Sequence, residues 1–267
     1  MFLNVRAFGA VGDGRALDSD AINATIVAAA TAGGGTVYFP AGVYLSYSVR
    51  LRSCVTLHLD TGATLLAAGD PPPGHETILA MLTAEGTLPG GGAGDSGSFY
   101  AGDSFGEDEP RPIAPPSAST PPIPSFAQAF AASATSPNAN PADHSPGYDP
   151  PEPNEHTQYQ DHGHSHWHNS LIWGEDLHDV AIVGGGTIDG RGLTWNADPA
   201  NPVGNKAVAL KRCRNITIRD ITFFRTGHFT ILASGCDILT IDNVKIDTNR
   251  DGLDIDCCRH VSIANCY

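Results

Sequence analysis

Three segments of this 267-residue chain share one pattern: Cys213-Arg-Asn-Ile-Thr-Ile218, Cys236-Asp-Ile-Leu-Thr-Ile241 and Cys258-Arg-His-Val-Ser-Ile263. Each reads Cys-x-x-apolar-Ser/Thr-Ile, and the starts of the three copies are almost evenly spaced. A period of about 20 to 30 residues with no helix between copies is typical of a solenoid whose coils stack roughly 4.8 Å apart. Leucine-rich repeats need leucines where these copies have mostly Ile and Val. The repeat therefore predicts an all-β chain folded as a parallel β-helix.

The regular spacing also indicates how the cysteines pack. Alternation along a strand does not place the Cys and the two apolar residues on one face unless the chain bends after the Cys. In a stacked arrangement, Cys213, Cys236 and Cys258 then form a buried ladder of thiols. Disulfides are an alternative because stacked Cα atoms are close enough, but parallel side chains point alike, which favours free thiols.

Weaker copies of the repeat lie nearer the N-terminus, at Ser53-Cys-Val-Thr-Leu57 and His178-Asp-Val-Ala-Ile182. A longer loop over residues 190–206 separates the second of these from the Cys213 copy. Residues 18–30 predict a helix, with Asp18 or Ser19 as N-cap and a run of three glycines beyond its end. Because the open end of a β-helix exposes unpaired strand edges, we expect this helix to cover the first coil.

Residues 90–162 interrupt the pattern. Of the 20 prolines, 13 lie between Pro110 and Pro153, so this segment lacks the hydrophobic periodicity to build a core of its own. We expect one incomplete β-helix domain over residues 1–267, with 90–162 as an extended insertion. The insertion is either a wall over a cleft or a variable decoration.

Composition limits the partners of the chain. Fifteen Lys and Arg against 29 Asp and Glu give a formal net charge of −14, which argues against a general nucleic-acid binder or a binder of anionic membranes. No apolar run of about 18 residues suits a transmembrane helix, and residues 1–6 lack the layout of a signal peptide. We expect neither nucleic acid nor membrane among the partners.

The richest polar stretch is Asp247-Thr-Asn-Arg-Asp-Gly-Leu-Asp-Ile-Asp256. Within it, Asn249-x-Asp251-Gly-Leu-Asp254 resembles the N-x-D-G-hydrophobic-D motif of glycoside hydrolase family 28, the polygalacturonases and their relatives. Further segments of the chain agree with this resemblance: Asn4-Val-Arg-Ala-Phe-Gly-Ala-Val-Gly-Asp-Gly14, Asp20-Ala-Ile22, Gly35-Thr-Val-Tyr-Phe-Pro-Ala-Gly-x-Tyr44, Ser170-Leu-Ile-x-Gly174 and Gly186-Thr-Ile-Asp-Gly-x-Gly192. The opening segment is shared across the wider pectate-lyase-like superfamily, so it indicates fold more than activity.

The resemblance implies a right-handed, single-stranded parallel β-helix that hydrolyses α-linked galacturonan, or a related pectic polymer, with inversion. Asp251 would be catalytic, on the side of the general base. Asn249, Asp254 and His228 would bind substrate, and His228, one coil before Asp251, would stack beneath it. Plainer readings remain open: Asn-x-Asp-Gly is also ordinary turn chemistry, Asp254 could be a solvated residue, and His228 an exposed turn histidine. The family implies no cofactor, and we expect no metal.

The family's Asp-Asp pair, which includes the proton donor, would fall one coil after Asp251 and thus beyond Tyr267. Its Gly-His-Gly turn and Arg-x-Lys clamp would lie further on. We therefore expect the N-terminal part of a longer enzyme, inactive by itself and a monomer when complete, with a pectic polysaccharide or oligogalacturonide as partner. The family implies secretion or a periplasmic location, and cytosolic cleavage of imported oligomers is the alternative.

Three further observations leave alternatives open. The tract His162-Gly-His-Ser-His-Trp-His168 would place four imidazoles on one strand face, but neighbours on such a face are about 6.6 to 7 Å apart, which favours a polar face over a metal site. Trp167 and Trp173 could stack on sugar or simply pack. Arg250 stands where the family commonly has Thr or Asn. As a candidate base beside Asp251, it keeps a polysaccharide lyase as an alternative function, next to a non-catalytic solenoid for binding or adhesion.

Overall fold

The computed structural model describes residues 1–69, 147–153, 155, 162–194, 204–248 and 250–267. These residues all belong to one compact unit of the chain. Most of the predicted 90–162 insertion and much of the predicted 190–206 loop lie outside the described residues. The described parts nevertheless contain every copy of the repeat.

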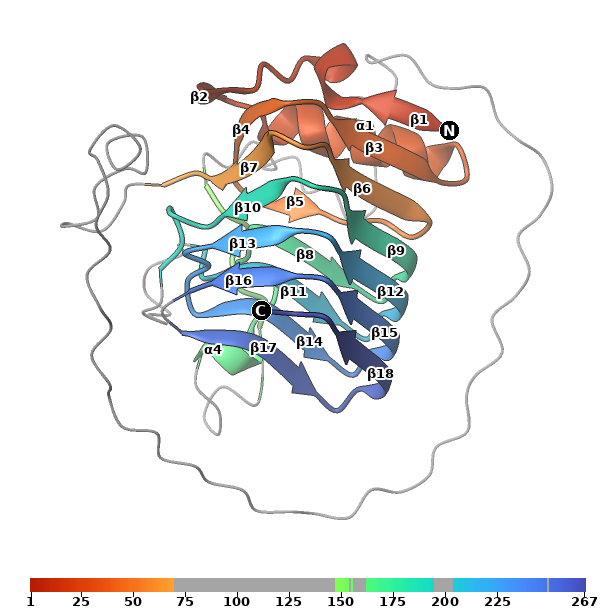
Figure 1. Cartoon of the computed structure of the whole chain (residues 1–267), viewed down its shortest axis with the longest axis vertical. Helices are drawn as coiled ribbons and strands as arrows, with labels where there is room; N and C mark the ends of the chain where they lie inside the picture. The colour runs from red at the N-terminus through yellow and green to blue at the C-terminus, as the bar shows by residue number, and fades with distance from the viewer. Residues whose placement is uncertain (70–146, 154, 156–161, 195–203, 249) are drawn as a thin grey trace. The chain divides into compact units, whose positions relative to one another are not determined.

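Three parallel sheets form the fold (Figure 1). Sheet A contains β1 (Phe2–Asn4), β3 (Gly35–Phe39), β6 (Val55–Leu59), β9 (His178–Val183), β12 (Arg214–Arg219), β15 (Asp237–Asp242) and β18 (Arg259–Ala264). Sheet B contains β2 (Asp13–Leu17), β4 (Gly42–Ser46), β7 (Ala63–Ala67), β10 (Thr187–Asp189), β13 (Thr222–Phe224) and β16 (Lys245–Asp247). Sheet C contains β5 (Val49–Arg50), β8 (Ile172–Glu175), β11 (Lys206–Lys211), β14 (Phe229–Ser234) and β17 (Asp251–Asp256).

From β3 to β17, each coil contributes one strand to each sheet in turn, as β12, β13 and β14 do. Equivalent strands of successive coils pair in parallel, so that Ile216 lies against Leu239 and Leu239 against Val261. The first two of these side chains are buried in the main core cluster. The predicted parallel β-helix, with one coil for each copy of the repeat, is therefore confirmed.

The cysteine ladder is confirmed as well. Cys213 and Cys236 are buried, Cys258 is half-buried, and all six cysteines of the chain are free thiols. The bend that the pattern requires occurs two residues after each ladder cysteine, at Asn215, Ile238 and His260, where φ is between 53° and 58°. This left-handed residue interrupts the alternation, so the thiol and the following apolar side chains share the inner face.

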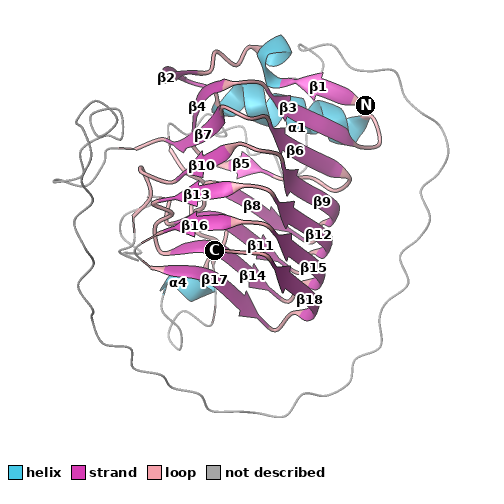
Figure 2. Ribbon diagram, in the orientation of Figure 1, coloured by secondary structure: helices cyan, strands magenta, loops and turns pink. Residues whose placement is uncertain are grey.

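A single long helix in the described part of the chain covers the first coil, as Figure 2 shows. Helix α1 (Ser19–Thr31) matches the prediction for 18–30 to within one residue and buries Ile22, Ile26 and Ala29 in the main core. Asp18 is its N-cap, but the Asp18 carboxylate accepts hydrogen bonds from the N–H groups of Val11 (2.7 Å) and Gly12 (3.1 Å) and none from the helix. It therefore anchors the preceding loop to the helix.

Two short helices complete the described secondary structure: the 3-10 helix η1 (Val5–Phe8) and α4 (His162–Ser165). None of the helices in the described part of the chain has the length and apolar character that crossing a membrane requires.

Replacing Gly184 by Ala is expected to destabilise the protein by about 2 to 4 kcal/mol. Gly184, between β9 and β10, has φ of 116°, and a Cβ there would lie 2.1 Å from the Leu59 carbonyl oxygen of the previous coil. Urea unfolding would measure the change. Gly33→Ala is the matched control, because φ is 88° but no atom lies within 4 Å of the new Cβ. It should cost only about 1 kcal/mol, and equal losses in the two variants would contradict the argument.

Candidate functional site

The outer face of sheet C holds the polar side chains that the repeat leaves out of the core. Ile172, Val208 and Ile231 occupy one inner row in register across β8, β11 and β14. The next residues along these strands form an outer row that continues onto β17: Trp173, Ala209, Leu232 and Asp254. A second outer row two residues further contains Glu175, Lys211, Ser234 and Asp256. Apolar and charged positions thus lie side by side on this face.

Residues 163–170, which we call the strap, lie against this outer face. Trp167, only 7% exposed, forms an apolar cluster separate from the main core with Ala209, Phe229 and Leu232. Its indole N–H donates to the Ser234 hydroxyl (3.3 Å), and Lys211 Nζ lies 4.2 Å from the ring centroid. Of the two readings of this tryptophan, packing is therefore the one that the structure supports.

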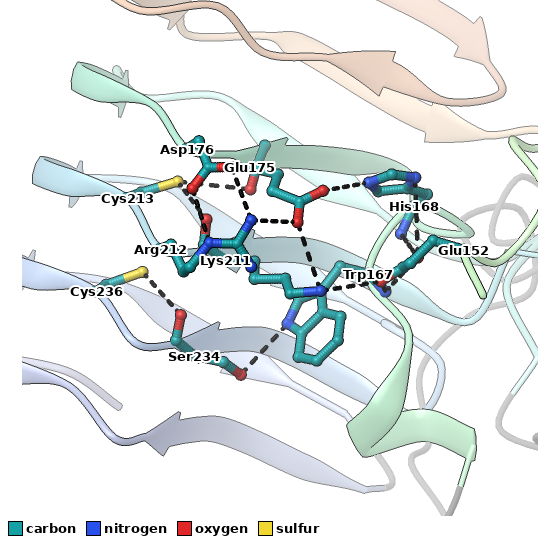
Figure 3. Close-up of polar contacts among 11 residues, drawn as sticks. Glu152, Trp167, His168, Glu175, Asp176, Lys211, Arg212, Cys213, Ser234 and Cys236 are labelled. Atoms are coloured by element: carbon teal, nitrogen blue, oxygen red, sulfur yellow. Dashed lines mark hydrogen bonds and ion pairs between the residues drawn. The ribbon is translucent and has the colours of Figure 1, made fainter. Parts of the chain in front are cut away.

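A charged network surrounds Trp167 (Figure 3). The Glu152 carboxylate accepts hydrogen bonds from the backbone N–H groups of Trp167 (3.0 Å) and His168 (3.1 Å). His168 Nε2 lies 2.9 Å from Glu175 Oε2, and the His168 ring stacks on Trp173 with centroids 4.0 Å apart. Trp173 is half-buried and donates its indole N–H to Asp149 (2.7 Å). The network fixes the strap to β8 and β11.

Positive charges hold Glu175 in its ionised form. Arg212 Nη2 lies 2.8 Å from a Glu175 oxygen, and Lys211 Nζ lies 3.4 Å from the same carboxylate. Burial on its own would raise the pKa of Glu175. The hydrogen bond with His168 and the charges of Lys211, His168 and Arg212 outweigh it, so the pKa lies below its usual value.

The histidine tract does not form the single strand face that alternation suggested. Its first residues form α4, so the side chains fan out to different partners. His164 Nε2 lies 2.9 Å from Asp254 Oδ2, His166 Nδ1 lies 3.0 Å from the Ser165 hydroxyl, and His168 contacts Glu175. These three imidazoles are thus engaged separately instead of converging on one ion.

Asp251 opens β17 and is exposed to solvent. Its register partner on β14 is Phe229, and the partner of Phe229 on β11 is Lys206. The expected stacking of His228 beneath Asp251 is therefore wrong by one residue. The paired residues of β14 and β17 are one position closer in sequence than Cys213 and Cys236 are. Asn249 lies outside the described residues.

His228 is instead packed beneath α4. It is 4% exposed, and its ring meets Phe229 and His164 edge to face at centroid distances of 4.4 and 6.1 Å. A Cβ on Gly163 would lie 2.2 Å from the His228 ring, so only glycine allows this approach. The reading of His228 as an exposed turn histidine is thus wrong. Asp254, half-buried and paired with His164, links the same helix to β17.

Sequence reasoning missed the network around Glu152, Glu175 and Lys211. Glu175 and Lys211 could have been found, because they lie two residues beyond the outer-row positions of their strands. Glu152 could not, because it lies within the proline-rich segment, where no periodicity gives a register.

Two family models match different parts of the chain. Residues 2–61 match the model described as rhamnogalacturonase A/epimerase, pectate lyase-like, and residues 154–267 match glycosyl hydrolases family 28. The second match includes the strap, β17 and Asp251.

Curated relatives match shorter stretches. A polygalacturonase of Juniperus ashei is 26% identical over an alignment of 117 residues that covers 38% of this chain and 23% of that protein. Mannuronan C5-epimerase AlgE3 of Azotobacter vinelandii is 61% identical over 82 residues, which make up 31% of this chain and 4% of that protein. The matches thus span less than a quarter of the length of these curated relatives.

Among solved structures, the hyperthermoactive exopolygalacturonase of Thermotoga maritima superposes with a TM-score of 0.59 at 18% identity. The match covers 100% of this chain and 52% of that one. At this identity the likeness shows the fold, and it agrees with the stacked sheets described above. Together, the two family models, the curated relatives and the shared fold support a glycosyl hydrolases family 28 protein of the pectin-lyase-like superfamily.

Proposed function

We propose that this protein acts in the hydrolysis of α-linked galacturonan, or a related pectic polysaccharide, with inversion at the anomeric carbon. The observation behind the proposal is Asp251, an exposed carboxylate at the start of β17 within the segment that matches family 28. An exposed carboxylate at the start of this strand can approach a polymer that lies across the coils. Asp251 would then act on the side of the general base.

In this scheme Asp251 takes a proton from a water molecule whose oxygen attacks the anomeric carbon. The glycosidic C–O bond breaks, and the leaving oxygen receives a proton from a carboxylic acid on the opposite side. The family resemblance assigns that acid to an Asp-Asp pair one coil further on, which the 267 residues do not include. We therefore propose that this chain does not turn over polymer by itself.

Asn249 and Asp254 are proposed to bind substrate beside Asp251. His228 is too buried for direct contact with a sugar, so we assign it an indirect part in binding, through its contact with His164. We further propose one β-helix domain over residues 1–267 with 90–162 inserted, acting as a monomer outside the cytoplasm on a pectic polymer or oligogalacturonide.

A second candidate function is a C5-proton abstraction on an alginate-type uronan, by epimerisation or elimination. The 61% identity over 82 residues to mannuronan C5-epimerase AlgE3, and the same identity to alginate lyase 7 of Azotobacter vinelandii, favour it. In such a reaction a base removes the proton from C5 of a uronic acid. Arg250, next to Asp251, is the candidate base from the sequence.

Product analysis tests both proposals. The chain, and a form extended through the following coil, are incubated separately with polygalacturonate and with mannuronan. We expect new reducing ends without unsaturated sugar from polygalacturonate, and only with the extended form. Ultraviolet absorbance of an unsaturated product, or epimerised residues in the proton NMR spectrum of mannuronan, would support the second candidate instead. Turnover of polygalacturonate by the 267-residue chain would refute its proposed inactivity.

A further inference from the structure

Away from the outer face of sheet C, a thiol, an imidazole and a carboxylate meet at one edge of sheet A. They belong to Cys54, His178 and Asp179, whose donor atoms all lie within 4.8 Å of one another. Cys54 Sγ lies 3.9 Å from His178 Nδ1, and His178 Nδ1 lies 2.9 Å from Asp179 Oδ2. Three different classes of metal ligand thus face one point.

The β-helix brings these residues together from distant parts of the sequence. Cys54 directly precedes β6, and His178 and Asp179 open β9, the next strand of sheet A. The register of Thr56 with Ala181 places Cys54 opposite Asp179, and both have left-handed backbone, with φ of 63° and 56°. The same turn in two neighbouring coils therefore projects the thiol and the carboxylate side by side.

Hydrogen bonds hold the backbone of the cluster in place. The Cys54 N–H donates to the His178 carbonyl oxygen (3.0 Å), and the His178 N–H donates to the Ser53 hydroxyl (3.1 Å). The Asn215 side-chain amide, from the following coil, donates to Asp179 Oδ1. This bond leaves Asp179 Oδ2 directed at the imidazole, as an outer partner commonly orients a metal-binding carboxylate.

The donor set and its spacing suit zinc. Zn²⁺ binds thiolate at about 2.3 Å and imidazole nitrogen or carboxylate oxygen at about 2.0 to 2.2 Å. In a tetrahedron these lengths place sulfur and nitrogen about 3.6 Å apart and nitrogen and oxygen about 3.3 Å apart. The observed separations of 3.9 and 2.9 Å differ by a few tenths of an ångström, which small side-chain rotations can absorb.

We propose that Cys54, His178 and Asp179 form a surface Zn²⁺ site with a fourth position open to water. Binding requires the thiolate and a His178 tautomer with its proton on Nε2, so that Nδ1 is free to coordinate. The ion replaces the hydrogen bond between His178 and Asp179. It joins residues of two adjacent coils, Cys54 and His178, which are 124 positions apart in sequence.

Two other places in the fold supply matched controls. The Cys257 thiol lies 3.3 Å from Asp256 Oδ1 and is exposed, so this pair offers thiol and carboxylate. His260 Nδ1 lies 2.7 Å from Asp237 Oδ1 at the same kind of left-handed turn, so this pair offers imidazole and carboxylate. Neither pair combines all three ligand classes of the proposed site.

Titration of the metal-free, reduced chain with Co²⁺ tests the proposal. We expect a thiolate-to-cobalt absorption band with one equivalent of Co²⁺, its displacement by Zn²⁺, and a Zn²⁺-dependent rise in the unfolding temperature of several degrees. Cys54→Ser is expected to abolish the band, and His178→Ala to weaken binding at least about 10-fold. Asn215→Ala should weaken it about 10-fold, whereas Cys257→Ser and His260→Ala should leave it unchanged.

Equal unfolding temperatures of all variants in EDTA would show that the substitutions leave the fold intact. The proposal is overturned if the wild-type chain gives no thiolate band, or if the band survives in Cys54→Ser and disappears in Cys257→Ser. A Zn²⁺ effect on unfolding that persists in His178→Ala would overturn it too. The site is independent of the proposed glycosidase activity, and no substrate enters the test.

Discussion

Replacing Asp251 by Asn is expected to lower the turnover of polygalacturonate by about 100- to 10,000-fold, the range of a general base. The amide has nearly the same shape as the carboxylate but cannot accept the proton of the attacking water. Asp251 is exposed at the start of β17, so the substitution removes no buried contact and the fold should persist. The rate of release of reducing ends, measured with a longer form that contains the proposed Asp-Asp pair, is the readout.

Asp256→Asn is the matched control for this prediction. Asp256 is also an exposed carboxylate on β17, but it lies at the opposite end of the strand from Asp251. It should keep nearly full activity. Loss of less than about threefold in Asp251→Asn, or equal loss in both variants, would remove Asp251 from the catalytic assignment.

The repeat made most of the fold predictable because equivalent residues of each copy occupy the same place in successive coils. The ladder cysteines mark the inner corner between sheets C and A, and the following Ile and Val positions mark the core side of sheet A. The required bend was visible as a conflict with alternation, and the structure resolves it with left-handed residues such as Asn215 and Ile238. Helix α1 was predictable for a similar reason, since its apolar spacing and the glycines beyond it are local signals.

The parts that sequence reasoning missed depend on contacts between segments with no shared pattern. The separation of Cys54 and His178 along the chain hides their proximity, and only the stacking of β6 on β9 reveals it. The predicted position of His228 was wrong for another reason. The interval between the first two ladder cysteines does not hold for the coil from β14 to β17, where the register partner of Asp251 is Phe229. Because of this shift of one residue, Phe229 and not His228 lies opposite Asp251.

Replacing Trp167 by Ala is expected to destabilise the protein by about 3 to 5 kcal/mol, as for other buried aromatic side chains. Trp167 is the strap residue whose apolar side chain packs into the cluster with Ala209, Phe229 and Leu232. Truncation would leave a cavity among these residues and would remove the aromatic ring that lies against Lys211. Urea unfolding measures the loss of stability. It is monitored by far-ultraviolet circular dichroism, which does not depend on the fluorescence of the replaced tryptophan.

Trp167→Phe separates packing from hydrogen bonding. It keeps most of the apolar area but removes the indole N–H that the Ser234 hydroxyl accepts, so we expect a loss of only about 1 to 1.5 kcal/mol. Hydrogen exchange at the Trp167 and His168 amides, which donate to Glu152, should accelerate in Trp167→Ala. If these amides exchange faster while the global stability is unchanged, the strap opens independently of sheet C. If both change together, Trp167 joins the strap to the cooperative unit that presents Asp251, and the charged network alone is too weak to hold it there.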